Sequence, residues 1–146
     1  MIFVGEAPFD PGALLTQFCA GRAEVGAVAT FTGLARAEAG EAAILELEAY
    51  PGFTEAEIGK IAEAARARFG LDDLMIRHRV GQIAPGEPIV FVATAAKHRR
   101  AAFEACDYLM DYLKSRAPFW KKQHGPGGAR WVEPRAEDHA DVGRWE

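Results

Sequence analysis

The chain has 146 residues, of which 49% are hydrophobic and 26% charged, and its formal net charge is −4. This length predicts one domain over residues 1–146, and the acidic balance argues against a general nucleic-acid-binding protein. No apolar run reaches membrane-spanning length, the N-terminus lacks the pattern of a signal peptide, and two cysteines without a CxxC motif form no disulfide framework. We therefore expect a cytoplasmic globular protein.

The N-terminal part of the chain predicts a strand, a helix and a second strand. Residues 2–4 are apolar and form the first short strand. Asp10 followed by Pro11 is an N-cap with proline at the first helical position, so a helix begins here and runs to about Phe18. The β-rich run at 26–33 predicts the next strand.

The middle of the chain predicts a strand followed by a capped helix. The segment "AILELEAY" (43–50) alternates apolar and acidic residues, which is typical of a strand with one buried face. Thr54, with Glu57 three residues later, predicts a capping box. The helix that starts there runs to about Phe69 and is closed by Gly70.

The second half predicts two strands and the longest helix. "LMIRHRV" (74–80) alternates, and "IVFVATA" (89–95) is an apolar strand after a turn. A helix from about His98 to Ala117 ends before Pro118. Beyond it we expect an aromatic–basic segment, a glycine-rich loop, a short strand at 130–133 and a polar tail from about 136. The fold class is α/β (α+β), with mainly antiparallel strands and about three helices.

The lysines are few and unevenly placed. The chain has five lysines against twelve arginines, and three of the five lie in "DYLKSRAPFWKK". Lys114 falls at the rim of the apolar stripe of the longest helix, and Lys121 follows an aromatic pair that we expect to anchor the next segment in the core. An amine can lose its proton, which a guanidinium cannot, and two close ammonium groups ease each other's deprotonation. The stripe is formed by Ala102, Phe103, Cys106, Leu109, Met110 and Leu113.

The alternative is that both lysines are ordinary solvated surface residues. Lys114 would then extend from the helix and pair with Asp107 or Asp111.

A basic cluster, "KHRR" (97–100), marks the start of the longest helix. Helix N-termini favour anions such as phosphate, and His98 and Arg99 add charge-assisted donors. Arg36, in a polar segment after "TFTG", is another candidate hydrogen-bond donor, and the sequence shows no evident structural role for it. The alternative for all of them is an ordinary charged surface.

Several other kinds of chemistry are disfavoured. Ser115 is the only serine and points away from the apolar stripe, which argues against serine catalysis. The four histidines and two cysteines show no metal-ligand spacing, and Cys106 is expected to be a core residue rather than a nucleophile. No metal or cofactor is expected.

From about residue 25 to 135, the chain closely resembles the large, catalytic subunit of molybdopterin synthase (MoaE family). The resemblance is carried by "FTGLAR", "LELEAYPGFTEAEI", "HRVGQIAPGEPIVFV" and "HRRAAFEACDYLMDYLKSRAPFWKK". It implies an α/β hammerhead-type fold that forms a homodimer. It also implies that each subunit binds a small ubiquitin-like partner whose C-terminal Gly-Gly carries a thiocarboxylate, which gives a heterotetramer. The implied activity is sulfur transfer to cyclic pyranopterin monophosphate, which forms the dithiolene of molybdopterin in molybdenum cofactor biosynthesis.

The resemblance also implies roles for individual residues. One position departs from the family pattern, which commonly reads "WK(K/R)E": Gln123 replaces the glutamate, and any tuning of a lysine by that carboxylate is altered here. We expect three of the anion-binding residues (Arg36, His98 and Arg99) to converge on the phosphate of the substrate. The full set implied is Lys114 and Lys121 for catalysis, with Arg36, His98, Arg99 and Arg135 for substrate binding.

Two other functions are compatible with parts of the sequence. A non-catalytic module that binds a ubiquitin-like tail needs a similar groove, but not both lysines. An RNA-binding domain would use "APFWKKQHGPGGARW" (117–131) as a basic strip with stacking aromatics, although the net charge disfavours it.

Overall fold

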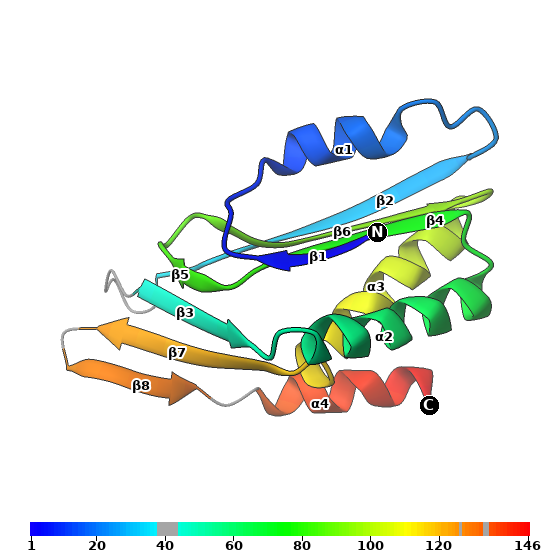
Figure 1. The fold of residues 1–146 in the computed structure, drawn as a ribbon. Helices are drawn as coiled ribbons and strands as arrows, with labels where there is room; N and C mark the ends of the chain where they lie inside the picture. Colours follow the sequence, from blue (N-terminus) through cyan, green and yellow to red (C-terminus); the bar gives the residue numbers. More distant parts are fainter. Residues whose placement is uncertain (38–43, 126, 133–134) are drawn as a thin grey trace.

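The described part of the chain folds into two four-stranded β-sheets with four α-helices (Figure 1). The structure is a computed structural model that describes residues 1–37, 44–125, 127–132 and 135–146. The mixed class with mainly antiparallel strands agrees with the prediction from the sequence. None of the helices in the described ranges is long and apolar enough to cross a membrane.

The first sheet carries most of the core. Its strands lie in the order β1 (Ile2–Gly5), β4 (Asp73–Arg79), β6 (Pro88–Ala96) and β2 (Ala27–Leu34). β1 and β4 pair in parallel, and the other neighbours are antiparallel. β2 therefore forms one edge of this sheet.

Helices cover both faces of the first sheet. α1 (Pro11–Cys19) lies on one face, and α2 (Phe53–Phe69) and α3 (Arg99–Ser115) lie on the other (Figure 1). Along β6, Val90 and Val92 pack toward α2 and α3, while Phe91, Ala93 and Ala95 pack toward α1. Burial on both faces explains why this strand reads as one continuous apolar run.

The second sheet is smaller and antiparallel throughout, in the order β5 (Gly81–Ile83), β3 (Ile44–Ala49), β7 (Phe119–Gly125) and β8 (Gly128–Val132). β5 and β7 were not predicted as strands. β7 carries aromatic and basic residues on both faces, and its strand geometry comes from pairing with β3 and β8 rather than from a local pattern.

The helix ends show which local signals are reliable. The Asp10 carboxylate accepts a hydrogen bond from the Gly12 N–H at 2.9 Å, and Gly70 ends α2 with φ +63°, both as predicted. The capping box was placed wrongly: the Glu55 carboxylate accepts from the Gly52 N–H at 2.6 Å. Thr54 is instead fully buried, and its hydroxyl donates to the carbonyl of Pro118 at 3.0 Å.

The apolar stripe of α3 is confirmed except at one position. Five of its six residues are buried, but the Phe103 side chain is 66% exposed. Phe103 lies on the same rim of the helix as exposed Asp107 and Lys114, and this rim faces solvent rather than the sheet.

The C-terminal segment was expected to be a polar tail and is instead packed. α4 (Ala136–Val142) and a 3₁₀ turn (Gly143–Trp145) lie against α3 (Figure 1). Val142 is 2% exposed, and the Trp145 ring packs edge-on against Phe69 and Tyr108. Two well-spaced apolar residues are enough to dock so short a helix, but they are too weak a pattern to predict it.

Substituting Gly26 with alanine is expected to destabilise the protein by about 1–3 kcal/mol or more. A Cβ at this position would lie 2.1 Å from the backbone carbonyl oxygen of Lys97, which cannot move without shifting the start of α3. Gly59→Ala is the matched control, because nothing lies within 4 Å of its Cβ position. Because Gly59 lies inside the helix α2, Gly59→Ala should stabilise the protein by roughly 0.5–1 kcal/mol. Thermal unfolding measures both changes. A Gly26→Ala variant that melts at the same temperature as the native chain would contradict this packing.

Candidate active site

The predicted site residues lie in two groups at opposite ends of α3. His98 is the N-cap of this helix and Arg99 its first residue, whereas Lys114 lies in its last turn. Seventeen residues form this helix, which makes it roughly 25 Å long. One chain therefore presents two separate basic regions, each with its own surroundings.

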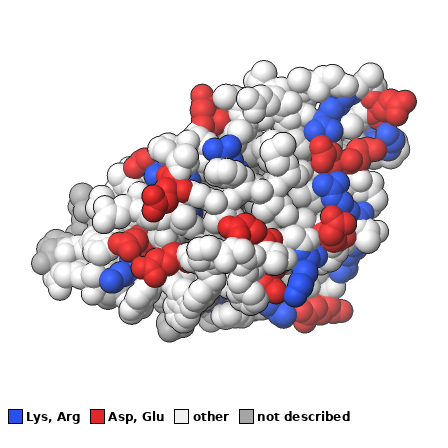
Figure 2. Space-filling view, viewed as in Figure 1, with Lys and Arg blue, Asp and Glu red and all other residues white. Residues whose placement is uncertain are grey.

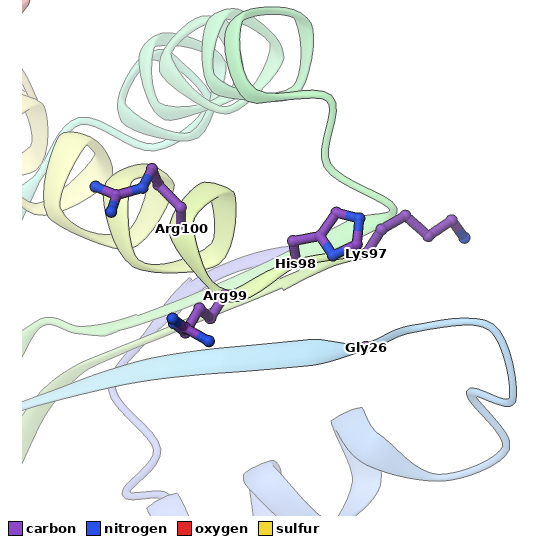
Figure 3. Close-up of a pocket in the computed structure, with 5 residues that line it drawn as sticks. All are labelled: Gly26, Lys97, His98, Arg99 and Arg100. Carbon is purple, nitrogen blue, oxygen red and sulfur yellow. The ribbon is translucent and has the colours of Figure 1, made fainter.

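A pocket of about 470 Å³ opens at the N-terminal end of α3, and Figure 3 shows its residues. Lys97 is held at its rim by Asp72, with 3.0 Å between the ammonium and the carboxylate. Arg99 extends over the strand that follows Gly26 (Figure 3). The free N–H groups of the first helical turn and this cluster of cations together suit an anion. The pocket is lined by Gly26, Lys97, His98, Arg99 and Arg100.

Arg36 lies far from this pocket within one chain. In the pairing of β2 with β6, Ala27 lies opposite Ala96, next to the pocket, whereas Leu34 lies opposite Pro88. Arg36 comes after Leu34, and an eight-residue strand spans roughly 26 Å. A single chain does not bring Arg36 together with His98 and Arg99. Their convergence remains a prediction for an assembly of two chains.

At the C-terminal end of α3, two of the other predicted cations, Lys121 and Arg135, lie near Lys114. Its side chain has an exposed surface, yet the neighbouring elements shield the ammonium from water, and this desolvation is the main cause of a lowered pKa. The positive charges of Lys121 and Arg135 lower the pKa of Lys114 further, and the negative charge of Asp138 opposes them. The sequence had suggested an ordinary ion pair with Asp107 or Asp111.

That alternative pairing is not what the structure shows. Arg144, from the C-terminal turn, forms ion pairs with both aspartates, at 3.3 Å from Asp107. Within the described ranges, no carboxylate lies at ion-pair distance from the Lys114 amine.

Lys121 is positioned by β7. It lies opposite Leu47 of β3 and Val132 of β8, so its side chain is on the same face of the second sheet as these apolar residues. Phe119 is partly buried, as expected of an anchor, and its ring stacks on His78 with 4.0 Å between centroids. Trp120 is not an anchor, because it is 51% exposed on the opposite face of the strand.

The exposed face of the second sheet carries an aromatic cluster instead. Trp120 and Trp131, on neighbouring strands, have ring centroids 6.0 Å apart, and the Tyr50 ring lies 6.4 Å from Trp120. The amine of Lys122 lies 5.1 Å from the centroid of the Trp131 ring. This cluster and the Lys121 side chain are on opposite faces of the sheet.

Two residues near Lys114 were not identified from the sequence. His78 lies on the core face of β4, and burial lowers its pKa to about 4, with a further contribution from the positive charge of Lys114. The imidazole is therefore neutral at physiological pH. Asp138 is in α4, the segment expected to be a tail. The alternation of β4 pointed His78 inward, but only the packing of β4 and α4 places either residue near Lys114.

The residues set aside from catalysis have structural surroundings. Cys106 is buried, and desolvation raises the pKa of its thiol to about 12, which makes it a poor nucleophile. The Ser115 hydroxyl donates to the carbonyl of Asp111 at 3.0 Å. In the described ranges, no group of three or more histidine, cysteine, aspartate or glutamate side chains is arranged to hold a metal ion.

Comparison with known proteins gives consistent results. The model of the MoaE protein family matches residues 4–116, which include Lys114 but end before Lys121. The chain is 68% identical over 146 residues to the molybdopterin synthase catalytic subunit of Caulobacter vibrioides, covering 100% of this chain and 97% of that protein.

Solved structures that resemble this chain give the same result. The MoaE protein of Burkholderia ambifaria is 45% identical, with a TM-score of 0.85 over 99% of this chain and 97% of that one. Molybdopterin synthase from Staphylococcus aureus is 26% identical, with a TM-score of 0.80 over 89% of this chain and 95% of that one.

Proposed function

The chain belongs to the MoaE family of molybdopterin synthase catalytic subunits, and on this premise we propose how its residues carry out the reaction. It is a sulfurtransferase of molybdenum cofactor biosynthesis. We propose that the sulfur comes from the C-terminal thiocarboxylate of a small ubiquitin-like partner and goes to cyclic pyranopterin monophosphate. Two transfers form the dithiolene, and we expect them to take place in the cytoplasm.

The observation that supports this mechanism most directly is the environment of Lys114. Attack by a thiocarboxylate sulfur on a substrate carbon forms a carbon–sulfur bond while a carbon–oxygen bond at that carbon breaks, and the departing oxygen takes up a proton. The acyl group of the partner then remains on the sulfur. Water then releases the acyl group as a carboxylate, through a tetrahedral oxyanion. A lysine with a lowered pKa is suited to accept and return protons during these steps. Lys121 and Arg135 supply positive charge that stabilises the oxyanion.

We propose that the complete site is formed by two chains. The basic pocket at the start of α3 and the lysines at its end are about one helix length apart, roughly 25 Å, which is too far for one small substrate to span. β2 is an edge strand, and Phe31 and Leu34 on it are exposed, at 40% and 56%. An edge strand with apolar side chains is suited to pair with another copy of itself.

Antiparallel pairing of β2 with β2 of a second chain would account for the distance between Arg36 and the His98–Arg99 pocket within one chain. The strand begins beside the pocket and ends before Arg36. A two-fold axis at its centre would bring the His98–Arg99 pocket of one chain to the Arg36 end of the other. The homodimer then has two composite sites, and one small partner per subunit gives a heterotetramer.

The second function is a module that binds the tail of a ubiquitin-like protein without catalysis. A docking module needs only positive charge, so it gives no role to an amine whose pKa is lowered by desolvation. An RNA-binding strip is disfavoured because Figure 2 shows basic and acidic side chains interspersed on the face that it views, rather than one basic stripe.

One assay tests the proposed function directly. The purified chain is incubated with a thiocarboxylated ubiquitin-like partner and cyclic pyranopterin monophosphate, and dithiolene product is measured. Product formation supports the sulfurtransferase. Partner binding without product would leave only the tail-binding module.

Arg99→Ala is expected to weaken binding of the cyclic monophosphate by roughly 1.5–3 kcal/mol, which is the scale of a charged hydrogen bond. The pocket position of Arg99, over the start of β2, is the physical reason. Titration calorimetry measures the change. Lys60→Ala removes one exposed positive charge on α2 and should leave the affinity unchanged. Equal affinities for the Arg99 variant and the native chain would exclude this pocket as the phosphate site.

A further inference from the structure

The C-terminal turn is fastened to α3 by contacts that meet at Asp111. The indole N–H of Trp145 donates to the Asp111 carboxylate at 2.7 Å, and the Arg144 guanidinium pairs with the same carboxylate. Arg144 also pairs with Asp107 at 3.3 Å, and Arg68 donates to the carbonyl oxygen of Trp145 at 2.7 Å. We refer to Asp107, Asp111, Arg144 and Trp145 as the Asp111 clasp.

Asp111 has no evident use in α3 apart from this clasp. Its side chain is only 10% exposed, although at about 100° per residue it lies on the opposite side of α3 from Leu109 and Leu113. A buried carboxylate is unfavourable unless charged or polar partners compensate it. Those partners, Arg144 and Trp145, come from the C-terminal turn. The buried Asp111 carboxylate therefore stabilises the docked position of that turn.

The other end of the C-terminal segment, the first turn of α4, lies near Lys114. Asp138 is in the first turn of α4, and its carboxylate accepts a hydrogen bond from the N–H of Arg135 at 3.3 Å. The charged groups that act on the Lys114 amine come from α4, from its N-cap and from β7. α4 supplies the negative charge of Asp138, Arg135 precedes α4, and β7 supplies Lys121. β4 contributes His78, which is neutral at physiological pH.

We propose that α4 is a positioning element: the Asp111 clasp holds it against α3 so that Asp138 stays beside Lys114 and sets the fraction of this amine that is protonated. This inference rests on the proposed function, since that function gives the protonation of Lys114 its importance. Asp111 and Asp138 are positioning residues, and neither needs to touch the substrate. The clasp fixes one end of the helix, and the rigid helix transmits that position to the other end.

Competitive labelling with trace acetic anhydride, followed by mass spectrometry, tests the proposal without any turnover. Only the neutral amine reacts, so the labelling rate of Lys114 near neutral pH reports its neutral fraction. Asp138→Asn removes the negative charge but keeps an oxygen that accepts from the Arg135 N–H. The Lys114 rate should rise about two- to fivefold, as expected for loss of one charge at a partly exposed site.

Asp141→Asn is the matched control. It removes the same charge one turn further along α4, toward the Asp111 clasp and away from Arg135. The Lys114 rate should stay unchanged, and so should the rate of exposed Lys60 in every variant. If Asp138→Asn has no effect, or if Asp141→Asn has an equal effect, the proposal is wrong.

The clasp is tested by a double-mutant cycle with Trp145→Ala. Hydrogen–deuterium exchange should become faster at residues 136–142 while exchange in β6 stays slow, which shows local release rather than unfolding. In this background, Asp138→Asn should change the Lys114 labelling rate by less than half as much as in the native chain. An undiminished effect would mean that the clasp does not hold Asp138 in place.

These outcomes are separable from those of the proposed function. The labelling experiment uses the chain alone, so its result stands even if the sulfur-transfer assay finds no dithiolene. Where the assay does find product, Asp138→Asn should also move the rising limb of the pH–rate profile to lower pH, and a loss of folding alone would not produce that shift.

Discussion

Lys114→Arg is expected to reduce dithiolene formation by at least about 100-fold, nearly as much as Lys114→Ala, because loss of a general acid or base typically costs this much. Arginine keeps the positive charge but stays protonated at any pH at which the protein is folded. The lowered pKa of Lys114 means that activity in the native chain rises with pH as the amine loses its proton. Both variants should lack that rise.

The fold should tolerate either substitution. Lys114 is exposed on the rim of α3, and desolvation already disfavours its charged form in the folded state, so removing it gives up no stabilising ion pair. The melting temperature should therefore change by no more than a few degrees. A Lys114→Arg chain that forms product at the native rate would show that the lysine acts only as a fixed charge.

Heterodimers that combine two inactive chains are expected to regain about half of the native activity, because one of their two sites is intact. One chain carries Lys114→Ala, and the other carries His98→Ala with Arg99→Ala. If each site takes Lys114 from one chain and the basic pocket from the other, one site holds all the substitutions and the second holds none. Co-expression with two different affinity tags isolates the mixed dimers, and the dithiolene assay measures them.

The controls for this experiment are the two variant homodimers and a native dimer that carries both tags. A mixed dimer no more active than the better homodimer would place Lys114 and the pocket of the same chain in one site. Light scattering that finds only monomers, with and without the small partner, would contradict the two-chain site altogether.

The parts of the fold that could be predicted are those governed by neighbouring residues. Asp10 and Pro11 start a helix, and Gly70 ends one, through contacts within a single turn. β6 was evident because a strand buried on both faces is apolar throughout. The prediction failed where a local motif competed with a tertiary contact. Thr54 resembles an N-cap in the sequence, but its hydroxyl donates a hydrogen bond to the carbonyl of Pro118.

The same distinction applies to the candidate site. Lys114 and Lys121 were selected as candidates because lysine is scarce and both lie in one short segment of the sequence. The distance between Arg36 and the pocket was not predictable, since it depends on the register of β2 against β6. Asp138 was missed because docking of α4 depends on a buried aspartate and an indole that lie 34 residues apart in the sequence.

The two indoles of the β7–β8 hairpin give this protein an intrinsic optical probe. Trp120 and Trp131 have ring centroids 6.0 Å apart and planes inclined at 72°, an edge-on geometry in which their electronic transitions couple. Such a pair should produce an exciton couplet in the circular dichroism spectrum, and the couplet depends on the spacing of the two strands. Lys121 is the next residue after Trp120, on the opposite face of the same strand. A change in the spacing of β7 and β8 beside this lysine should therefore change the spectrum, with no dye attached and no change to the chain.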